Sequence, residues 1–141
     1  MDQTTADALR SSPFFAGLGE DDLERIAATG EHVRFAAGDA IIQKGDRGEA
    51  MYLILRGTAE VEVGGRVHKP GPGQPLGEMA LFSSKRRTAT VTAIEAVEAL
   101  RVPAERFREF LVQNPTVAVA ILEQVVDRLR EVQDRVEAYW S

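Results

Sequence analysis

Hydrophobic and polar residues follow three patterns along the chain, and the first, over residues 1–31, is typical of short helices. Apolar side chains at Leu9 and Leu18 are followed by the stretch GEDDLERIAATG, which begins with acidic residues and ends at Gly30. Acidic residues stabilise the first turn of a helix, and glycine commonly follows the last turn. The pattern therefore predicts N-terminal helices over residues 1–31.

From residue 32 to residue 102 the pattern changes to short runs of Val, Ile and Thr, which glycines interrupt every few residues. In AEVEVGGRVHK, valines alternate with glutamates and a Gly64-Gly65 pair follows, which predicts a β-hairpin. Many short strands with turn residues between them are typical of a closed antiparallel sandwich or barrel, of which the jelly roll is one form. The predicted fold class is therefore mainly β with flanking helices.

The pattern over residues 103–141 is helical again, with a break at Asn114-Pro115 and a long amphipathic run after it. The apolar residues of this run are spaced 3-4-3-4-3 and form a narrow heptad seam, which consists of Leu122, Val125, Leu129, Val132, Val136 and Tyr139. Ile121 and Val126 lie beside the seam, where they can face the barrel. A helix that packs only on its own domain usually has a wider apolar stripe, so the seam favours a parallel homodimer through this helix.

The 141 residues show no internal repeat and no second domain, so we expect a single domain over residues 1–141. Hydrophobic residues make up 44% and charged residues 28%, which argues against disorder. The net charge of −5, with no basic run longer than Lys85-Arg86-Arg87, argues against a nucleic-acid partner. The sequence has no signal-peptide pattern and no apolar run of about 18 residues, so we expect a cytoplasmic protein without membrane contact.

The residue patterns of common catalytic, metal and cofactor sites are absent from the sequence. There is no cysteine, no P-loop and no G-x-S-x-G motif, and GPGQPLG departs from the dinucleotide-binding fingerprint. His32 and His68 are the only histidines, and neither has a carboxylate at ligand spacing. The sequence therefore predicts no catalytic residue, no metal site and no cofactor, and we do not expect an enzyme.

Two segments resemble the cyclic nucleotide-binding domain family. The segment IIQKGDRGEAMYLILRG, residues 41–57, is similar to the family's strand–turn–strand element, and LGEMALFSSKRRTATVTA, residues 76–93, is similar to its phosphate-binding cassette. The family commonly has Phe before the Gly-Glu pair and Pro before the arginine, where this chain has Leu76 and Arg86. The resemblance implies a jelly-roll barrel over residues 32–102 between N-terminal and C-terminal helices, with cyclic AMP or cyclic GMP as the ligand.

The resemblance also implies which cassette residues bind the ligand, namely Leu76, Gly77, Glu78, Met79, Ala80, Arg87, Thr88 and Ala89. An arginine presents parallel N–H donors that match two phosphate oxygens, and glycine lets the backbone approach the ligand closely. A short helix beginning at Gly77 would direct free N–H groups, from around Met79 and Ala80, at the same anion. Glu78 can accept the hydrogen of the ribose 2′-hydroxyl. The alternative for Glu78 and Arg87 is an ion pair that braces a hairpin.

Two further assignments each keep a structural alternative. The Thr88 hydroxyl can reach the phosphate within the cassette, and the resemblance implies that Thr here favours cyclic GMP without excluding cyclic AMP. The alternative is that Thr88 is an ordinary β-branched strand residue. Ala89 keeps the phosphate pocket clear because it is small. The resemblance implies that the C-terminal helix covers the nucleotide base through Arg128, Leu129 and Val132. Arg128 is otherwise a solvated charge that pairs with acidic neighbours.

These observations predict a regulatory module that binds a cyclic nucleotide and couples occupancy to movement of its C-terminal helix. One alternative is a ligand-free dimerisation module of the same fold, against which the intact Glu78 and Arg87 argue. Another is the sensor part of a longer transcription regulator or enzyme, because no DNA-recognition helix follows the long helix in these residues. The output partner is unknown from the sequence.

Overall fold

The computed structural model describes residues 1–83 and 85–140, with the side chains among them as far as residue 136. Two helices come first, α1 (Gln3–Ser11) and α2 (Glu20–Ala28), and two come last, α3 (Ala104–Gln113) and α4 (Pro115–Trp140). The strands described between them are β1 (Glu31–Phe35), β2 (Ala40–Ile42), β3 (Ala50–Arg56), β4 (Ala59–Val63), β5 (Arg66–His68), β6 (Pro75–Leu76), β7 (Val91–Ala93) and β8 (Val97–Pro103). A short 3₁₀ helix, η1 (Glu78–Leu81), lies between β6 and β7.

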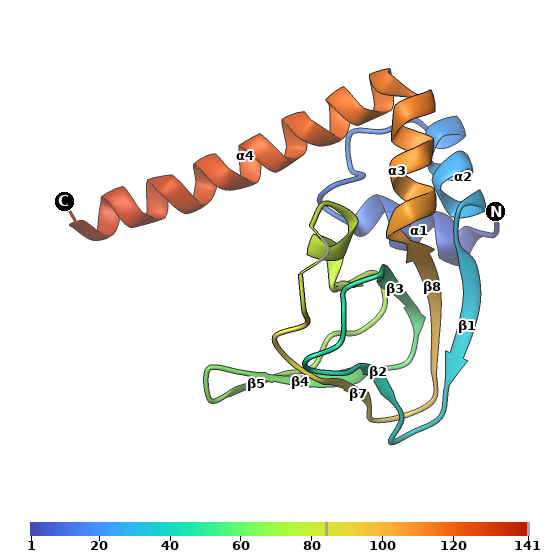
Figure 1. Cartoon of the computed structure of the whole chain (residues 1–141), viewed down its shortest axis with the longest axis vertical. Coiled ribbons are helices and arrows are strands. Elements are labelled where there is room, and N and C mark those ends of the chain that lie inside the picture. The colour runs from blue at the N-terminus through green and yellow to red at the C-terminus, as the bar shows by residue number, and fades with distance from the viewer. Residues whose placement is uncertain (84, 141) are drawn as a thin grey trace.

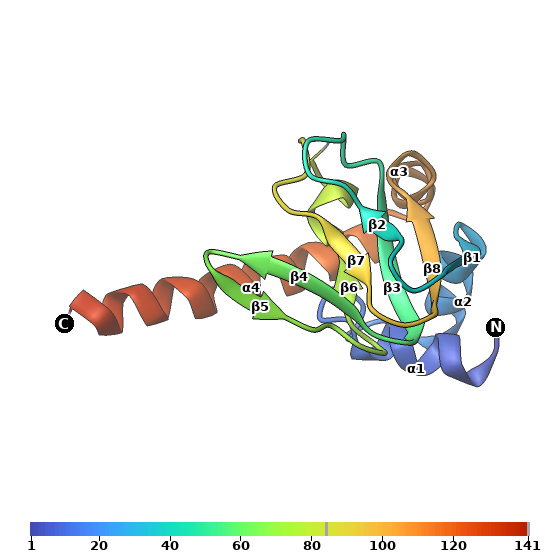
Figure 2. The same cartoon turned by 90° about the horizontal axis from the view of Figure 1, so that it is seen from below.

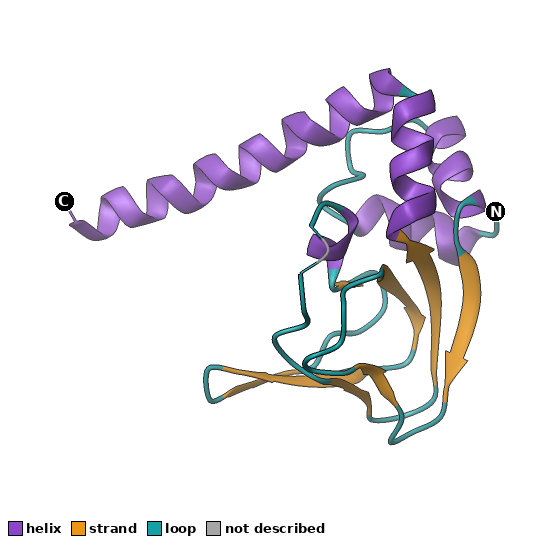
Figure 3. Ribbon diagram, in the orientation of Figure 1, coloured by secondary structure: helices purple, strands orange, loops and turns teal. Residues whose placement is uncertain are grey.

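The strands form two antiparallel sheets that enclose a core, which confirms the predicted jelly-roll class. Their orders are β1-β8-β3-β6 and β2-β7-β4-β5. Figure 1 shows α1, α2 and α3 gathered at the end of the barrel where β8 runs into α3, and Figure 3 separates the helical and strand regions by colour. The molecule is therefore mainly β with flanking helices at both ends of the chain.

Strands β3 and β8 lie in the middle of the first sheet and are buried on both faces. Successive side chains of a strand point to opposite faces. Met51 and Leu53 of β3 and Leu100 of β8 pack against the helices, whereas Ile54 and Ala99 pack between the two sheets. This double burial explains why β3 is a continuous apolar run rather than an alternating one.

The predicted hairpin and the predicted helix break are both confirmed. Strands β4 and β5 form a hairpin in which Val63 pairs with Arg66, and its two glycines have φ values of 59° and 78°, as the turn requires. Helix α3 ends before Asn114, whose φ of −131° and ψ of 67° leave the helical region, and α4 begins at Pro115. Proline suits the first position of a helix because its missing N–H is not needed there.

Helix α4 packs on the domain through its N-terminal half. Val117 and Ile121 are buried in the helical core, and Val125 packs partly against it. Val126, expected to face the barrel, keeps 38% of its surface exposed because the helix leaves the domain over this stretch. Figures 1 and 2 both show the rest of α4 projecting beyond the barrel. The exposed seam residues are Leu122, Leu129, Val132 and Val136, while the Tyr139 side chain lies outside the described residues.

Candidate functional site

The cassette segment, residues 76–93, leaves the first sheet at Leu76 and turns sharply at Gly77. Leu76 pairs with Tyr52 of β3 and is buried between the sheets. Gly77 has φ 66° and ψ 35°, a left-handed conformation that costs other residues about 1–2 kcal/mol. A Cβ on Gly77 would lie 2.9 Å from Cζ of Arg87. The turn therefore needs glycine both for its backbone conformation and for the space that Arg87 occupies.

Arg87 is held at the end of the cassette loop by two backbone carbonyls. Its Nη1 donates to the Gly77 oxygen at 3.2 Å, and its Nη2 donates to the oxygen of Ala50 at the start of β3. The side chain is half-buried, and no carboxylate in the described part of the chain forms an ion pair with it. Burial lowers the pKa of Arg87 from its usual value, with Tyr52 acting weakly the other way. A fixed, partly desolvated guanidinium without a counter-ion is well suited to bind an anion.

The glycine turn of the first segment that resembles the family runs beside the end of the cassette loop. The N–H of Gly45 donates to the Arg87 oxygen at 3.0 Å, and the N–H of Gly48 donates to the Lys85 oxygen at 3.0 Å. A Cβ on Gly48 would lie 3.1 Å from the Cβ of Ala80, so a larger residue would press on η1. The two segments therefore form one site, although they are separate in the sequence.

A pocket of about 530 Å³, called here the cassette pocket, opens between η1 and the loop that carries Arg87. Its size lies within the range of small-molecule sites, roughly 300–1,000 Å³. Of the expected ligand-binding residues, six line it, namely Gly77, Met79, Ala80, Arg87, Thr88 and Ala89. Leu76 lines a smaller neighbouring pocket, and Glu78 lines neither. The structure thus brings most of the predicted residues together.

Glu78 is partly exposed, and in the chain it stands between Gly77 and Met79, which both line the cassette pocket. None of the ion pairs between described residues joins Glu78 to Arg87. The alternative of an ion pair that braces a hairpin is therefore not realised, because Arg87 uses carbonyl acceptors instead. The Glu78 carboxylate remains available to accept a hydrogen bond from a ligand.

Of the two backbone N–H groups expected to be free at the start of η1, those of Met79 and Ala80, the described part of the structure leaves only that of Met79 free. The N–H of Ala80 donates to the Gly77 oxygen at 3.1 Å, so it is not free. This follows from the 3₁₀ geometry, in which an N–H bonds to the carbonyl three residues earlier. The N–H groups of Glu78 and Met79 have no acceptor among the described residues. The pair of free donors is thus Glu78 and Met79 rather than Met79 and Ala80.

Three polar residues of the cassette pocket, Ser83, Lys85 and Arg86, were not predicted from the sequence. Lys85, Arg86 and Arg87 bring three cationic side chains to the pocket, and none of the described residues that line it is acidic. Nη1 of Arg86 donates to the Gly45 oxygen at 2.9 Å, which orients its guanidinium. The signal in the sequence was the basic run itself, which is too short for a nucleic-acid surface but sufficient for a small anion.

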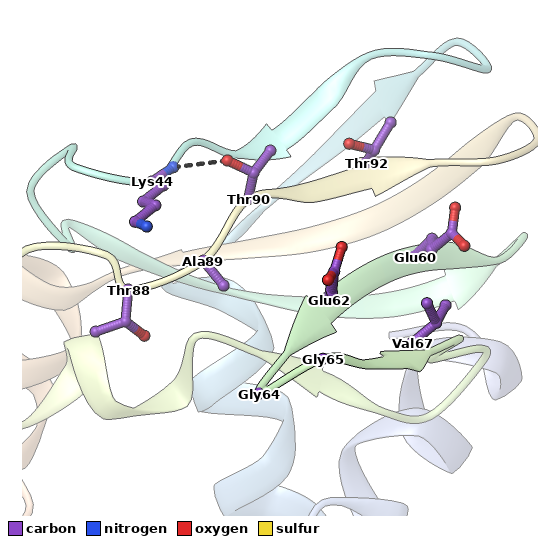
Figure 4. Close-up of a pocket in the computed structure, with 10 residues that line it drawn as sticks. All are labelled: Lys44, Glu60, Glu62, Gly64, Gly65, Val67, Thr88, Ala89, Thr90 and Thr92. Carbon is purple, nitrogen blue, oxygen red and sulfur yellow. Dashed lines mark hydrogen bonds between the residues drawn. The ribbon is translucent and has the colours of Figure 1, made fainter.

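A second pocket of about 570 Å³ lies on the outer face of the second sheet (Figure 4). Thr90, the residue before β7, lines this outer pocket, whereas Val91, the first residue of β7, lines the cassette pocket. Glu60 and Glu62 bring two carboxylates to the outer pocket against the single cation of Lys44. An anionic ligand is therefore favoured by the charges of the cassette pocket and disfavoured by those of the outer pocket.

The structure places the three expected lid residues on α4, away from the cassette pocket. Cζ of Arg128 lies 5.6 Å from the centre of the Phe14 ring, and Leu129 and Val132 are 65% and 52% exposed. None of the three lines the cassette pocket. The ion pairs between described residues include none with Arg128, so the alternative of pairing with acidic neighbours is not seen. The lid assignment stays a prediction for the ligand-bound molecule.

Metal sites and membrane spans are the remaining features that bear on function. In the described ranges, no cluster of three or more His, Cys, Asp or Glu side chains could hold a metal ion. None of the helices described is both long and apolar enough to cross a bilayer.

Comparison with known proteins agrees with this geometry. Residues 32–114 match the model of the cyclic nucleotide-binding domain. The chain is 29% identical over 129 residues to the cyclic AMP receptor protein of Thermus thermophilus, which covers 87% of this chain and 60% of that protein. It is 34% identical over 109 residues to the cAMP-dependent protein kinase regulatory subunit of Blastocladiella emersonii, covering 73% of this chain and 27% of the relative. The match therefore spans less than two thirds of each relative, 60% of the first and 27% of the second.

A solved structure shares this fold over most of the chain. The N-terminal domain of a transcriptional regulator from Streptomyces coelicolor A3(2) superposes with a TM-score of 0.83 at 32% sequence identity. The match covers 92% of this chain and 95% of that one.

Proposed function

The chain belongs to the cyclic nucleotide-binding domain family, whose members are regulatory ligand-binding modules, and from this membership we propose that it binds cyclic AMP or cyclic GMP in the cassette pocket. Relatives named for cyclic AMP favour that nucleotide. Thr88 lines the pocket and offers a hydroxyl that suits cyclic GMP, so both ligands belong in the test. No catalytic role is proposed for any residue.

The observation that carries this proposal is the half-buried Arg87 without a carboxylate partner among the described side chains. A guanidinium has five N–H donors, and the Gly77 and Ala50 carbonyls use one each. The remaining donors are available to the two exocyclic oxygens of a cyclic phosphate. Because the carbonyls already fix the guanidinium, little side-chain freedom is lost when the anion binds.

Other groups of the pocket fit the rest of a cyclic nucleotide. The free N–H of Met79 would donate to the phosphate, and the Glu78 carboxylate would accept from the ribose 2′-hydroxyl. Ile42 and Val91 supply an apolar wall for the sugar and base. The small Ala89 leaves room beside Arg87.

We further propose that occupancy changes the position of α4. Helix η1 contacts the helical core directly, because Nε of Arg108 in α3 donates to the Leu81 oxygen at 3.3 Å. Phe82, the residue after η1, packs edge-on against Phe107 of α3 with ring centres 6.2 Å apart. A ligand that draws η1 toward Arg87 would therefore shift α3 and, through it, α4. Such a ligand selects between two arrangements by its differential contacts with them.

The exposed seam of α4 supports a homodimer, and we propose that the movement of α4 acts within this dimer. The seam residues Leu129 and Val132 are more than half exposed, and their spacing suits a parallel two-stranded coiled coil. A second copy would cover both. The output partner would then respond to the relative position of the two α4 helices in the dimer.

Calorimetric titration with cyclic AMP, cyclic GMP and linear AMP tests the ligand. Arg87→Ala should lower the affinity for the cyclic nucleotides at least tenfold, because each charged hydrogen bond contributes about 1.5–3 kcal/mol. Arg34→Ala, which removes an exposed guanidinium on β1, serves as the control and should bind as the parent does. Equal binding by parent and Arg87→Ala, or a preference for linear AMP, would contradict the proposal.

The sensor part of a transcription regulator is a second proposal for the role of the chain. It is favoured by the match over 95% of the Streptomyces regulator domain and by the 60% coverage of the Thermus receptor. Mass determination of the native protein tests it. A mass equal to that of these 141 residues would contradict it.

A further inference from the structure

Arg128 of α4 contacts the aromatic ring of Phe14. Its guanidinium carbon lies 5.6 Å from the centre of the Phe14 ring, within the range of a cation–π interaction. Phe14 belongs to the segment between α1 and α2 and is only 6% exposed, so its position is set by the core. Both residues lie outside residues 32–114, the part that matches the family model.

The same ring touches the turn that forms the cassette pocket. Phe14 packs edge-on against Phe82, with ring centres 5.8 Å apart. Phe82 is the C-terminal cap of η1, and η1 provides Met79 and Ala80 to the pocket. A displacement of η1 by a ligand would therefore act on the ring that binds Arg128.

We propose that Phe14 and the bound nucleotide compete for Arg128, so that the Phe14–Arg128 contact holds α4 in its ligand-free position. This inference rests on the proposed function and on the predicted role of Arg128 in covering the base of the bound nucleotide. The flat guanidinium stacks on one planar group at a time, either the Phe14 ring or the purine. A contact that exists only in the ligand-free arrangement lowers the apparent affinity by the fraction of molecules it holds there. Phe14 is thus a positioning residue that sets the ligand concentration at which α4 moves.

The first test replaces Phe14 by leucine, which keeps an apolar side chain in the core but removes the ring face. Affinity for the cyclic nucleotide that the parent binds should rise about two- to fivefold, the factor that corresponds to an exposed cation–π contact. Phe15→Leu is the matched control, because Phe15 is a buried neighbour whose ring pairs with Phe107 at 6.1 Å. The control should not raise the affinity.

The second test asks whether the effect depends on Arg128. In an Arg128→Met background, Phe14→Leu should leave the affinity unchanged, since no cation remains to be released. Hydrogen exchange of the ligand-free protein gives a readout without nucleotide. Amides of α4 around residue 128 should exchange about two- to fivefold faster in Phe14→Leu, but not in Phe15→Leu.

The outcomes separate this proposal from the one on which it rests. If the parent binds cyclic nucleotide but Phe14→Leu gains no more affinity than Phe15→Leu, the competition is wrong and the ligand assignment stands. An equal gain in the Arg128→Met background also overturns the competition, because the gain then comes from core packing. If the parent binds no cyclic nucleotide, the proposed function fails and the competition fails with it.

Discussion

Replacing Gly77 by alanine should displace Arg87 while the barrel stays folded. The left-handed backbone at φ 66° costs alanine about 1–2 kcal/mol of stability. The new Cβ would also lie 2.9 Å from Cζ of Arg87 and 3.1 Å from Cδ1 of Ile42, so the guanidinium must move. A displaced guanidinium loses at least one charged hydrogen bond to the ligand, which contributes about 1.5–3 kcal/mol. The affinity for a cyclic nucleotide should therefore fall at least tenfold.

Gly64 provides a control that separates backbone strain from displacement of Arg87. Its φ of 59° is similar, but no atom lies within 4 Å of an added Cβ. Gly64→Ala should therefore lose a similar amount of stability in urea unfolding, yet keep its affinity in calorimetric titration. If Gly77→Ala binds as tightly as Gly64→Ala, Arg87 is not fixed by this turn in the way described.

Three further predictions concern the ligand and assembly. Glu78→Gln should weaken binding of cyclic AMP more than of its 2′-deoxy analogue, and equal losses in titration would remove the ribose role. Lysine at both Leu129 and Val132 should convert a dimer to a monomer in sedimentation, because charges enter the seam. Gln133→Lys, a control off the seam, should leave the dimer intact. A parent protein that is monomeric at micromolar concentration would contradict the dimer. Thr88→Ala should cost cyclic GMP about 1 kcal/mol more than cyclic AMP, and equal losses would make Thr88 an ordinary strand residue.

The fold class was predictable because its signals are local. The Gly64-Gly65 turn needs positive φ, and Asn114-Pro115 interrupts a helix whatever surrounds it. The strand orders were not predictable, since the pairing of β1 with β8 joins residues far apart in the sequence and depends on packing of the whole barrel. For the same reason the sequence did not show that Val126 lies where α4 leaves the domain.

The candidate site was predictable in its charged residues but not in its backbone partners. Glu78 and Arg87 are visible as a motif; in the structure Arg87 lines the cassette pocket, and Glu78 stands between two residues that line it. The carbonyl oxygens of Gly77 and Ala50, which orient Arg87, carry no signature in the sequence because every residue has a carbonyl. The ring of Phe14 was equally hidden, since a buried phenylalanine predicts only core packing.

The anchoring of Arg87 has a consequence for the lifetime of the protein. Its two carbonyl acceptors, Ala50 in β3 and Gly77 at the turn after β6, are far apart in the sequence, so the site exists only when the barrel is folded. A ligand that binds only the closed barrel, present at 100 times its Kd, adds about 2.7 kcal/mol to the free energy of unfolding. That is a large share of the roughly 5–15 kcal/mol that holds a typical domain together. Proteases degrade unfolded chains, so the amount of this protein in a cell would itself rise and fall with its ligand.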